Sequence, residues 1–397
     1  MFVAILLLSI TIIVFFVQLT CFKRLYNYVT REMARPPRNF HPKATVILPC
    51  KGLDPGFRSN VEKLLQQDYP DFEVIFAVAS ETDPAYPVLS EVAATARIPA
   101  RILVAGINPI RAQKINNQLC ALEHMRPDSE VIVFVDSDVI ARNDFLSRLI
   151  DPLQEDRVGV CTGYRFYICS TNNWPAQLRG LWNRMTAWEM ANPKYAFAWG
   201  GAMAIRRDVF QKAGVAESWH QAADDDLSLT VAVKKLQLDV HFVPQCLVAS
   251  EGDAAIPEII EWTNRQLILT KVYYPELWGR AISRACIMAA WLLAMIFALS
   301  GWTFTHDWWM GAALCAGLAI LPLEFIFLVR ARRMWQSVLR DNSAHIQESF
   351  ASSCAALPLA HLVLPWVTLY SVLTNRIKWR GVTYELRSPT ETLVISQ

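Results

Sequence analysis

Two carboxylates, Asp136 and Asp138, stand one residue apart directly after five apolar residues at 131–135. That run contains only Val, Ile and Phe, which favour a buried strand. Ligands of open α/β sheets bind outside the carboxyl ends of the strands, and carboxylate oxygens suit Mg²⁺ or Mn²⁺. The pair therefore predicts that Asp138 binds a divalent cation and that Asp136 ligates it or contacts ribose and sugar. A surface turn is the alternative for an isolated pair of this kind.

A second acidic cluster, Asp224, Asp225 and Asp226, precedes an apolar stretch that predicts a helix. A carboxylate that accepts the proton of an acceptor hydroxyl gives direct displacement with inversion at the sugar. We assign that role to Asp225 and place Asp224 beside it in the catalytic site. Helix capping is the alternative for Asp224 or Asp226, although three adjacent acids are more than capping alone requires.

Polar residues after two other predicted strands complete a nucleotide-diphosphate site. Lys51 follows the first predicted strand, whereas Glu81 and Asp83 follow the second, and both loops are placed to hold the nucleoside. Lys114 is expected to meet a phosphate or the uracil edge of the donor. Exposure to solvent is the commoner fate of a lone lysine and is the alternative here.

A turn of small residues and a set of aromatic residues point to the acceptor. Trp199 precedes Gly200 and Gly201, whose lack of side chains would let the backbone approach a sugar or an acceptor. Aromatic residues that favour a membrane–water interface are found at Trp174, Trp182, Trp188, Trp262, Tyr273, Tyr274 and Trp278. On this interpretation the site opens at the bilayer surface and the acceptor is a lipid. Packing in the core is the alternative for the first three.

The elements that must position these residues alternate between strands and helices from about residue 44 to 248. Strands are predicted at 44–49, 72–78, 100–104 and 131–135. A helix at 61–67 carries an apolar face after the first strand. This alternation predicts an α/β fold with a mostly parallel sheet that helices cover on both faces.

Apolar segments flank this domain on both sides. Residues 2–21 carry no formal charge and are long enough to span a bilayer, and the basic residues that follow place the next domain in the cytosol. Residues 285–304 and 310–329 predict a helical hairpin across the membrane. Pro358 and Pro365 interrupt the last apolar run, for which we expect re-entrant half-helices, with a third apolar segment as the alternative.

The predicted organisation is therefore an N-terminal transmembrane helix at 1–22, a cytosolic catalytic domain at 23–280 and a C-terminal membrane region at 281–397. The chain has 397 residues and a net charge of +2, which does not suggest a nucleic-acid partner. Its nine cysteines lack the spacing of a zinc site, so we interpret them as reduced thiols of a cytosol-facing protein.

Together these residues resemble the ceramide glucosyltransferases and related bacterial membrane glycosyltransferases, which are inverting enzymes of the GT-A fold. The stretches that carry the resemblance are 48–55, 68–70, 72–74, 83–85, 114–117, 136–137, 192–195, 224–225 and 378–384. Their order and spacing are more specific than any one of them. The resemblance implies a UDP-sugar donor, a divalent cation (Mn²⁺ or Mg²⁺) and a lipid acceptor. It also matches Asp136 and Asp225 to the second and third family aspartates.

Three departures from the family pattern affect the predicted site. The first family aspartate has no clean match near Asp83, and Asn192, placed on the acceptor side, stands where the eukaryotic enzymes have a His. The Q/R-x-x-R-W motif is changed, because its two basic positions are acidic at 258 and 261. We expect Arg265 and Gln266, one helical turn downstream, to supply the missing contact to the pyrophosphate.

The leading hypothesis is an integral protein of a bacterial inner membrane that moves a sugar, glucose by resemblance, from a UDP-sugar to ceramide. A hopanoid, diacylglycerol or polyprenyl phosphate is the alternative acceptor. A non-catalytic membrane protein that retains the fold is the alternative from another class, and only the altered basic motif favours it. Buried carboxylates without a function are costly, which argues against this alternative.

Overall fold

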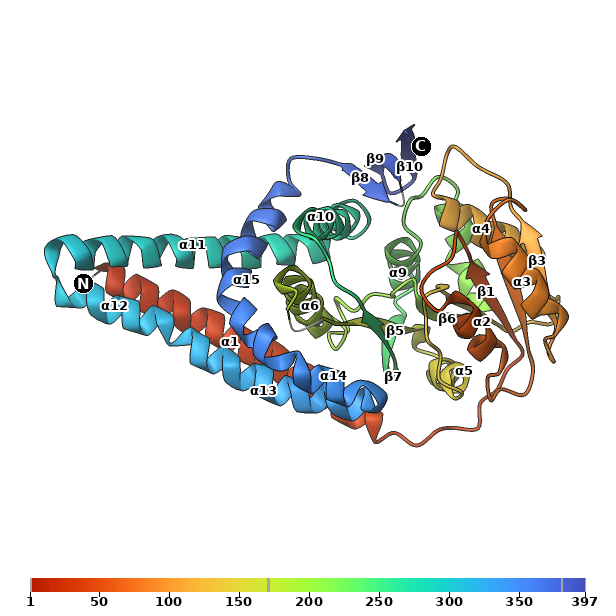
Figure 1. Ribbon diagram of the computed structural model, residues 1–397, viewed down its shortest axis with the longest axis horizontal. Coiled ribbons are helices and arrows are strands. Elements are labelled where there is room, and N and C mark those ends of the chain that lie inside the picture. The colour runs from red at the N-terminus through yellow and green to blue at the C-terminus, as the bar shows by residue number, and fades with distance from the viewer. Residues whose placement is uncertain (1, 170–171, 380, 397) are drawn as a thin grey trace.

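The computed structural model describes residues 2–169, 172–379 and 381–396, and at its centre lies a seven-stranded sheet (Figure 1). The strand order is β3-β2-β1-β4-β6-β5-β7. Its strands are β1 Ala44–Pro49, β2 Phe72–Val78, β3 Ala100–Val104, β4 Val131–Val135, β5 Val158–Ile168, β6 Ala202–Arg206 and β7 Asp239–Glu251. All neighbouring pairs are parallel except those of β6, which runs antiparallel to both β4 and β5. The expected α/β fold with a mostly parallel sheet is confirmed.

Helices cover both faces of this sheet because its central strands are apolar on both sides. On β1, Val46 and Leu48 face one cluster of buried residues, whereas Ile47 faces the other. The first cluster takes in α2 Phe57–Leu65, α3 Ala85–Ala94, α5 Phe145–Ile150 and the 3-10 helix η1 Asp151–Gln154. The second takes in α4 Gln113–Glu123, α7 Arg207–Lys212, α8 Val215–Ser218, α9 Asp226–Lys235 and α10 Ile256–Tyr273. Strands buried on both faces have this continuous apolar character.

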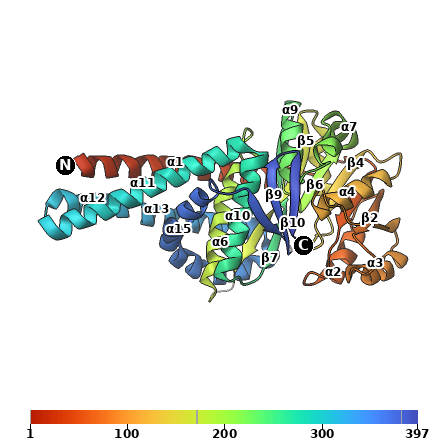
Figure 2. The same cartoon turned by 90° about the horizontal axis from the view of Figure 1, so that it is seen from above.

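Long apolar helices extend away from one side of the sheet domain (Figures 1 and 2). They are α1 Phe2–Met33, α11 Pro275–Thr305, α12 Trp308–Leu318 and α13 Ile320–Val338, and α15 Phe350–Tyr370 runs crosswise to them beside the sheet domain. With α12 and α13 taken as one continuous stretch, they supply the four candidate membrane spans found among the described residues. The turn between α11 and α12 lies where the sequence predicts it. There His306 has a φ of 52° and the Asp307 side chain accepts the N–H of Trp309.

The helix α15 is continuous through Pro358 and Pro365, in place of the two half-helices that the prolines suggested. Prolines are tolerated in such a helix where neighbouring protein covers the backbone. Here Ala356 and Ala360 of α15 pack against Leu178 and Leu181 of α6 Trp174–Thr186. Short elements complete this half of the chain: η2 Ala187–Glu189, η3 Arg340–Asn342 and α14 Ser343–Glu348.

The chain ends in a small antiparallel sheet that the sequence analysis did not anticipate. Its strands are β8 Arg376–Trp379, β9 Val382–Ser388 and β10 Glu391–Ser396. Ile377, Tyr384 and Leu386 are buried in the same cluster as α4 and α10, so this sheet packs beside the main domain and not among the membrane helices. Arg380, within the stretch 378–384 that resembles the family, lies outside the described residues.

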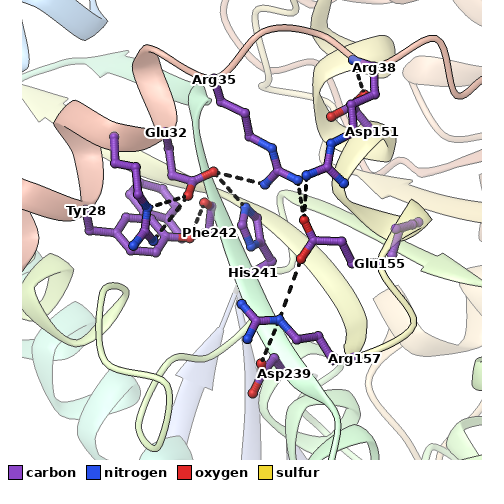
Figure 3. Close-up of polar contacts among 12 residues, drawn as sticks. Tyr28, Glu32, Arg35, Arg38, Asp151, Glu155, Arg157, Asp239, His241 and Phe242 are labelled. Atoms are coloured by element: carbon purple, nitrogen blue, oxygen red, sulfur yellow. Dashed lines mark hydrogen bonds and ion pairs between the residues drawn. The ribbon is translucent and has the colours of Figure 1, made fainter.

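A network of ion pairs joins the end of α1 to the sheet domain (Figure 3). Glu32 lies 3.1 Å from His241 Nε2 on β7 and 3.2 Å from a nitrogen of Arg35. Arg35 and Arg38 both reach Glu155 Oε1, at 2.5 and 2.8 Å. Because these contacts join a membrane helix to β7 and to the loop before β5, they fix the orientation of the sheet relative to the candidate membrane spans.

Candidate active site

The carboxyl ends of β1 and β4 open into one cavity of about 700 Å³. Asp136, Asp138 and Asp225 all line this cavity, although they come from distant parts of the sequence. Its walls also include residues of the helices α1, α11, α13 and α15. Residues from the sheet edge and from the candidate membrane spans therefore face the same space, and this size is typical of a pocket for a small molecule.

Lys114, at the start of α4, lies between the two acidic clusters. Its Nζ is 2.8 Å from Asp136 Oδ1 and 3.0 Å from Asp225 Oδ2, and it donates to the carbonyl of Gly200 at 3.1 Å. Burial acts to lower the pKa of Lys114, but Asp136 and then Asp225 outweigh it and hold that pKa well above its ordinary value. The ammonium is therefore charged, and it neutralises part of the acidic charge in the cavity.

Arg165, on β5, is the second cation of the site. Its two terminal nitrogens contact the two carboxylate oxygens of Asp138 at 2.7 and 2.9 Å, and one of them lies 3.8 Å from Asp136. The guanidinium also lies 5.0 Å from the centre of the Trp199 ring. Burial raises the pKa of Asp136. The Lys114 ammonium acts to lower this pKa, and the neighbouring Asp138 carboxylate acts to raise it further.

The three acids at the head of α9 make different contacts. Asp225 Oδ2 accepts a hydrogen bond of 2.8 Å from Gln118 Nε2 in addition to its contact with Lys114. Asp224 Oδ1 accepts the N–H of Leu227 at 2.8 Å, which satisfies a donor in the first turn of the helix. Burial, then the neighbouring Asp226 and Asp225, raises the pKa of Asp224 well above its usual range. Burial and then Asp225 raise the pKa of Asp226 to about 6.

The turn at Gly200 and Gly201 packs closely against these charged groups. A Cβ on Gly200 would lie 2.7 Å from Lys114 Nζ and 3.0 Å from the carboxylate oxygens of Asp225. The N–H of Gly200 donates to Asp226 at 2.7 Å, and the carbonyl of Gly201 accepts the N–H of Asp136 at 3.2 Å. The close backbone approach that the glycines predict is therefore made to this chain's own charged residues. Trp199 and both glycines line the cavity as well.

The residues predicted to hold the nucleoside are divided between the cavity and its surroundings. Lys51 lines the cavity. Glu81 is exposed, and Asp83 accepts the N–H groups of Gly52 and Ala85, each at 2.9 Å, so it shapes the loop after β1. Neither acid is among the described residues that line the cavity.

The remaining predicted residues are divided in the same way. Arg265 and Gln266 line the cavity from α10, and the Arg265 guanidinium lies 5.7 Å from the Trp379 ring of β8. Asn192 is not among the described lining residues, and its side chain donates to Glu189 at 3.5 Å. The structure therefore places Arg265 and Gln266 at this cavity. Asn192, predicted on the acceptor side, lies outside the described lining and contacts Glu189, which belongs to it.

Sequence reasoning missed two residues that contact the acidic clusters, Gln118 and Arg165. Gln118 lies four residues after Lys114 and so on the same face of α4, a spacing that could have identified it. Arg165 is a lone charged residue in the apolar run of β5, which is an available but weak signal. Its pairing with Asp138 depends on the sheet order, which the sequence does not state.

A divalent cation would be held by Asp136 and Asp138. Among the described residues, no group of three or more acidic, His or Cys side chains forms a metal cluster. Cations of the Mg²⁺ type commonly take one or two carboxylates and complete their shell with substrate phosphates and water. The two carboxylates fit a cation of that kind. Arg165 contacts both oxygens of Asp138, so it must release one of them for the cation to bind there.

Comparison with known proteins shows similarity over the whole chain and over parts of it. The profile of glycosyl transferase family 21 matches residues 3–392. A ceramide glucosyltransferase of Gibberella zeae is 28% identical over 149 residues, which cover 34% of this chain and 28% of that protein. One of Komagataella phaffii is 32% identical over 118 residues, covering 28% of this chain and 22% of that protein. The chain thus matches less than a third of the length of these relatives.

Two solved structures are among those that align with this chain. The mannosyltransferase PcManGT from Pyrobaculum calidifontis, in complex with GDP-Man and Mn²⁺, has a TM-score of 0.44 and 16% identity, covering 90% of this chain and 99% of that one. GalNAc-T7 with UDP, GalNAc and Mn²⁺ has a TM-score of 0.40 and 10% identity, covering 61% of this chain and 51% of that one.

The substitution Asp226→Asn should change how stability depends on pH. Because the folded-state pKa of Asp226 is about 6, the folded protein binds a proton between about pH 4 and 6 that the unfolded chain releases. The free energy of unfolding therefore falls as pH rises through this window. Asn keeps an oxygen for the N–H of Gly200 but does not titrate. The free energy of unfolding of the variant should therefore fall by about 1–3 kcal/mol less than that of the wild type over that window.

Thermal unfolding of the detergent-solubilised protein at pH 4, 5 and 6 measures this difference. Asp208→Asn is the control, because contact with Lys212 lowers the pKa of Asp208 and so gives it the opposite pH dependence. A fall in stability as steep in the Asp226 variant as in the wild type would contradict the assignment.

Proposed function

The chain belongs to glycosyl transferase family 21, and on that basis we propose that it moves glucose from UDP-glucose to ceramide in the membrane. One observation carries the proposal. A single cavity is lined at one end by the acidic residues after β4 and before α9, and at the other by apolar residues of α1, α11, α13 and α15. A polar activated sugar and a lipid hydroxyl can therefore meet in one space.

The donor occupies the end of the cavity beside β1 and β4 in this proposal. Lys51 and Lys114 provide positive charge for the nucleotide and its phosphates, and both line the cavity. Asp136 and Asp138 would hold the divalent cation, which when bound neutralises charge on the departing diphosphate. Arg165 turns from Asp138 towards the phosphates as the donor enters, because two oxygens of a phosphate group can replace the two carboxylate oxygens as its bidentate partner.

Asp225 is the base that takes the proton of the acceptor hydroxyl. Lys114 and Gln118 both contact its Oδ2, at 3.0 and 2.8 Å, and so fix the orientation of the carboxylate. We assign Oδ1 as the oxygen that accepts the proton. The acceptor oxygen then forms its bond to the sugar carbon as the bond to UDP breaks, which inverts the configuration at that carbon. Asp224 supports the base by satisfying the first turn of α9.

The acceptor enters from the membrane side. Residues of four helices line that part of the cavity with apolar side chains, among them Phe22, Leu25, Met288, Phe327 and Leu364. Each belongs to a helix long and apolar enough to cross a bilayer. The names of the relatives, ceramide glucosyltransferases, support ceramide as the lipid and glucose as the sugar. Trp199, Gly200 and Gly201 line the same cavity, and we assign them to the acceptor side.

In this proposal the protein lies in a bacterial inner membrane, and its catalytic domain lies in the cytosol. Basic residues stand at the domain side of two candidate spans, with Lys23 and Arg24 on α1 and Arg330, Arg332 and Arg333 on α13. Positive charge of this kind stays on the cytoplasmic side.

Polyprenyl phosphate is a second candidate acceptor, which one observation favours. Arg24, Arg280 and Arg284 surround the single carboxylate of Glu189, at 4.0, 3.1 and 2.5 Å. Arg280 and Arg284 also line the cavity. Their excess positive charge would suit a lipid phosphate, so an assay needs both ceramide and polyprenyl phosphate as acceptors.

We predict that Asp225→Asn abolishes sugar transfer while UDP still binds. Removal of a general base costs about 10²–10⁴-fold in rate, whereas the donor contacts assigned above do not involve this carboxylate. Mass detection of glycolipid formed from UDP-glucose, Mn²⁺ and ceramide measures the first effect, and calorimetric titration with UDP measures the second. The exposed Asp208→Asn variant is the matched control. Loss of UDP affinity would instead place Asp225 in the donor site.

We predict that Arg265→Ala weakens the affinity for UDP-glucose about tenfold to hundredfold, because a charge-assisted contact to the pyrophosphate contributes roughly 1.5–3 kcal/mol. The same titration measures this effect, with UDP-glucose as the ligand. Arg58→Ala is the control, because this exposed arginine pairs with Glu91 far from the cavity lining. Unchanged donor affinity and turnover in the Arg265 variant would show that another group replaces the altered family motif.

A further inference from the structure

Three polar side chains meet inside the bundle of candidate membrane helices. Gln18 of α1 donates through Nε2 to Glu324 Oε1 of α13, and His361 Nε2 of α15 lies 2.6 Å from Glu324 Oε2. Their exposed fractions are only 7, 6 and 8%. All three line the membrane end of the cavity that holds the candidate active site. We call Gln18, Glu324 and His361 the intramembrane cluster.

The cluster lies well inside the apolar part of the bundle. Gln18 is five residues before Lys23 on α1, and Glu324 is six residues before Arg330 on α13. At 1.5 Å per residue, they lie about 8 and 9 Å along their helices from the basic residues that mark the membrane boundary. A carboxylate at such a depth is costly, and ionisable residues of this kind mark a functional site by default.

Joining the helices is not a sufficient account of the cluster. Hydrogen bonds between membrane helices stabilise a bundle by only about 0.6 kcal/mol on average. Glu324 uses one oxygen for Gln18 and the other for His361. Gln18 Oε1, however, is buried and has no hydrogen-bond partner among the described residues. A buried acceptor in the cavity wall that lacks a donor is placed to take one from a bound ligand, since leaving it unpaired costs about 1–3 kcal/mol.

We propose that the intramembrane cluster selects acceptor lipids by taking a hydrogen bond from an N–H or O–H group of the lipid at Gln18 Oε1. This inference rests on the proposed function and specifies its acceptor class. The lipid must carry a donor in addition to the hydroxyl that receives the sugar. An N-acylated sphingoid base has such donors in its amide N–H and secondary hydroxyl. Diacylglycerol has only the hydroxyl that reacts, because its ester groups donate no hydrogen bond.

Glu324 and His361 are positioning residues in this proposal. Their contacts fix the Gln18 amide, because Nε2 donates to Glu324 and so turns Oε1 away from it. Apolar neighbours such as Phe22, Phe327 and Leu328 line the same part of the cavity. These neighbours exclude water, which increases the discrimination between lipids with and without a donor. A polar group that would otherwise remain unpaired is an effective basis for such selectivity.

The test compares Gln18→Met with the wild type, using ceramide, N-methylated ceramide and diacylglycerol of matched chain length. Rates with UDP-glucose give kcat and KM, and native mass spectrometry gives lipid binding without the donor sugar. We expect the variant to raise KM for ceramide about fivefold to tenfold with little change in kcat. The kcat and KM for diacylglycerol should not change. The preference for ceramide over diacylglycerol would fall by the same factor.

Thr11→Val is the matched control. Thr11 lies on the same helix, is buried, and its hydroxyl also has no partner among the described residues, but it does not line the cavity. This variant should keep the wild-type preference. A merely structural role of Gln18 would lower binding of all three lipids equally, and that result would overturn the proposal, as would an unchanged preference.

Analogues of ceramide keep the test decisive if Gln18→Met does not fold. On the wild type, at least one of two ceramide analogues, N-methylated or lacking the secondary hydroxyl, should then bind about fivefold more weakly than ceramide. Equal binding of ceramide, both analogues and diacylglycerol would refute the cluster as a selectivity site. Selective binding of ceramide without sugar transfer would instead refute the proposed function and leave the selectivity site standing.

Discussion

The site depends on the compensation of several buried or half-buried carboxylates by two half-buried cations, Lys114 and Arg165. Asp136 and Asp225 come from the end of β4 and the head of α9, and like charges at this separation would repel each other strongly in a cavity poor in water. Lys114 removes that conflict by lying within 3.0 Å of both, and Arg165 does the same for Asp138. Charge compensation therefore holds four separate elements, β4, α4, α9 and β5, around one cavity.

This arrangement also accounts for how the chain connects a sheet to a membrane. Strand β6 runs antiparallel beside β4, which brings the turn at Gly200 against Lys114 and Asp225. The same cavity then continues between α1, α11, α13 and α15. In the proposed function, this continuity lets a polar sugar donor and an apolar lipid acceptor meet in one space.

The sequence predicted the parts of the fold that strong local patterns specify. The four strands predicted up to residue 135 have the bounds observed for β1 to β4, because their apolar runs end at clear turn signals. The contact between Arg165 and Asp138 escaped prediction, because it depends on how β5 is placed in the sheet. The strands β8 to β10 escaped as well, since short amphipathic strands gain stability from packing against α10, which local pattern does not report.

A double-mutant cycle between Lys114 and Asp225 tests most directly whether charge compensation holds the site together. The free energy of unfolding would be measured in detergent for Lys114→Met, Asp225→Asn and the double variant. Lys114→Met leaves the Asp225 carboxylate without its cation, and Asp225→Asn removes one of the two carboxylates that compensate Lys114. The double variant should therefore be less destabilised than the sum of the two, with a coupling of about 0.5–3 kcal/mol. Additive effects would contradict the account, because they would mean that the two groups do not interact.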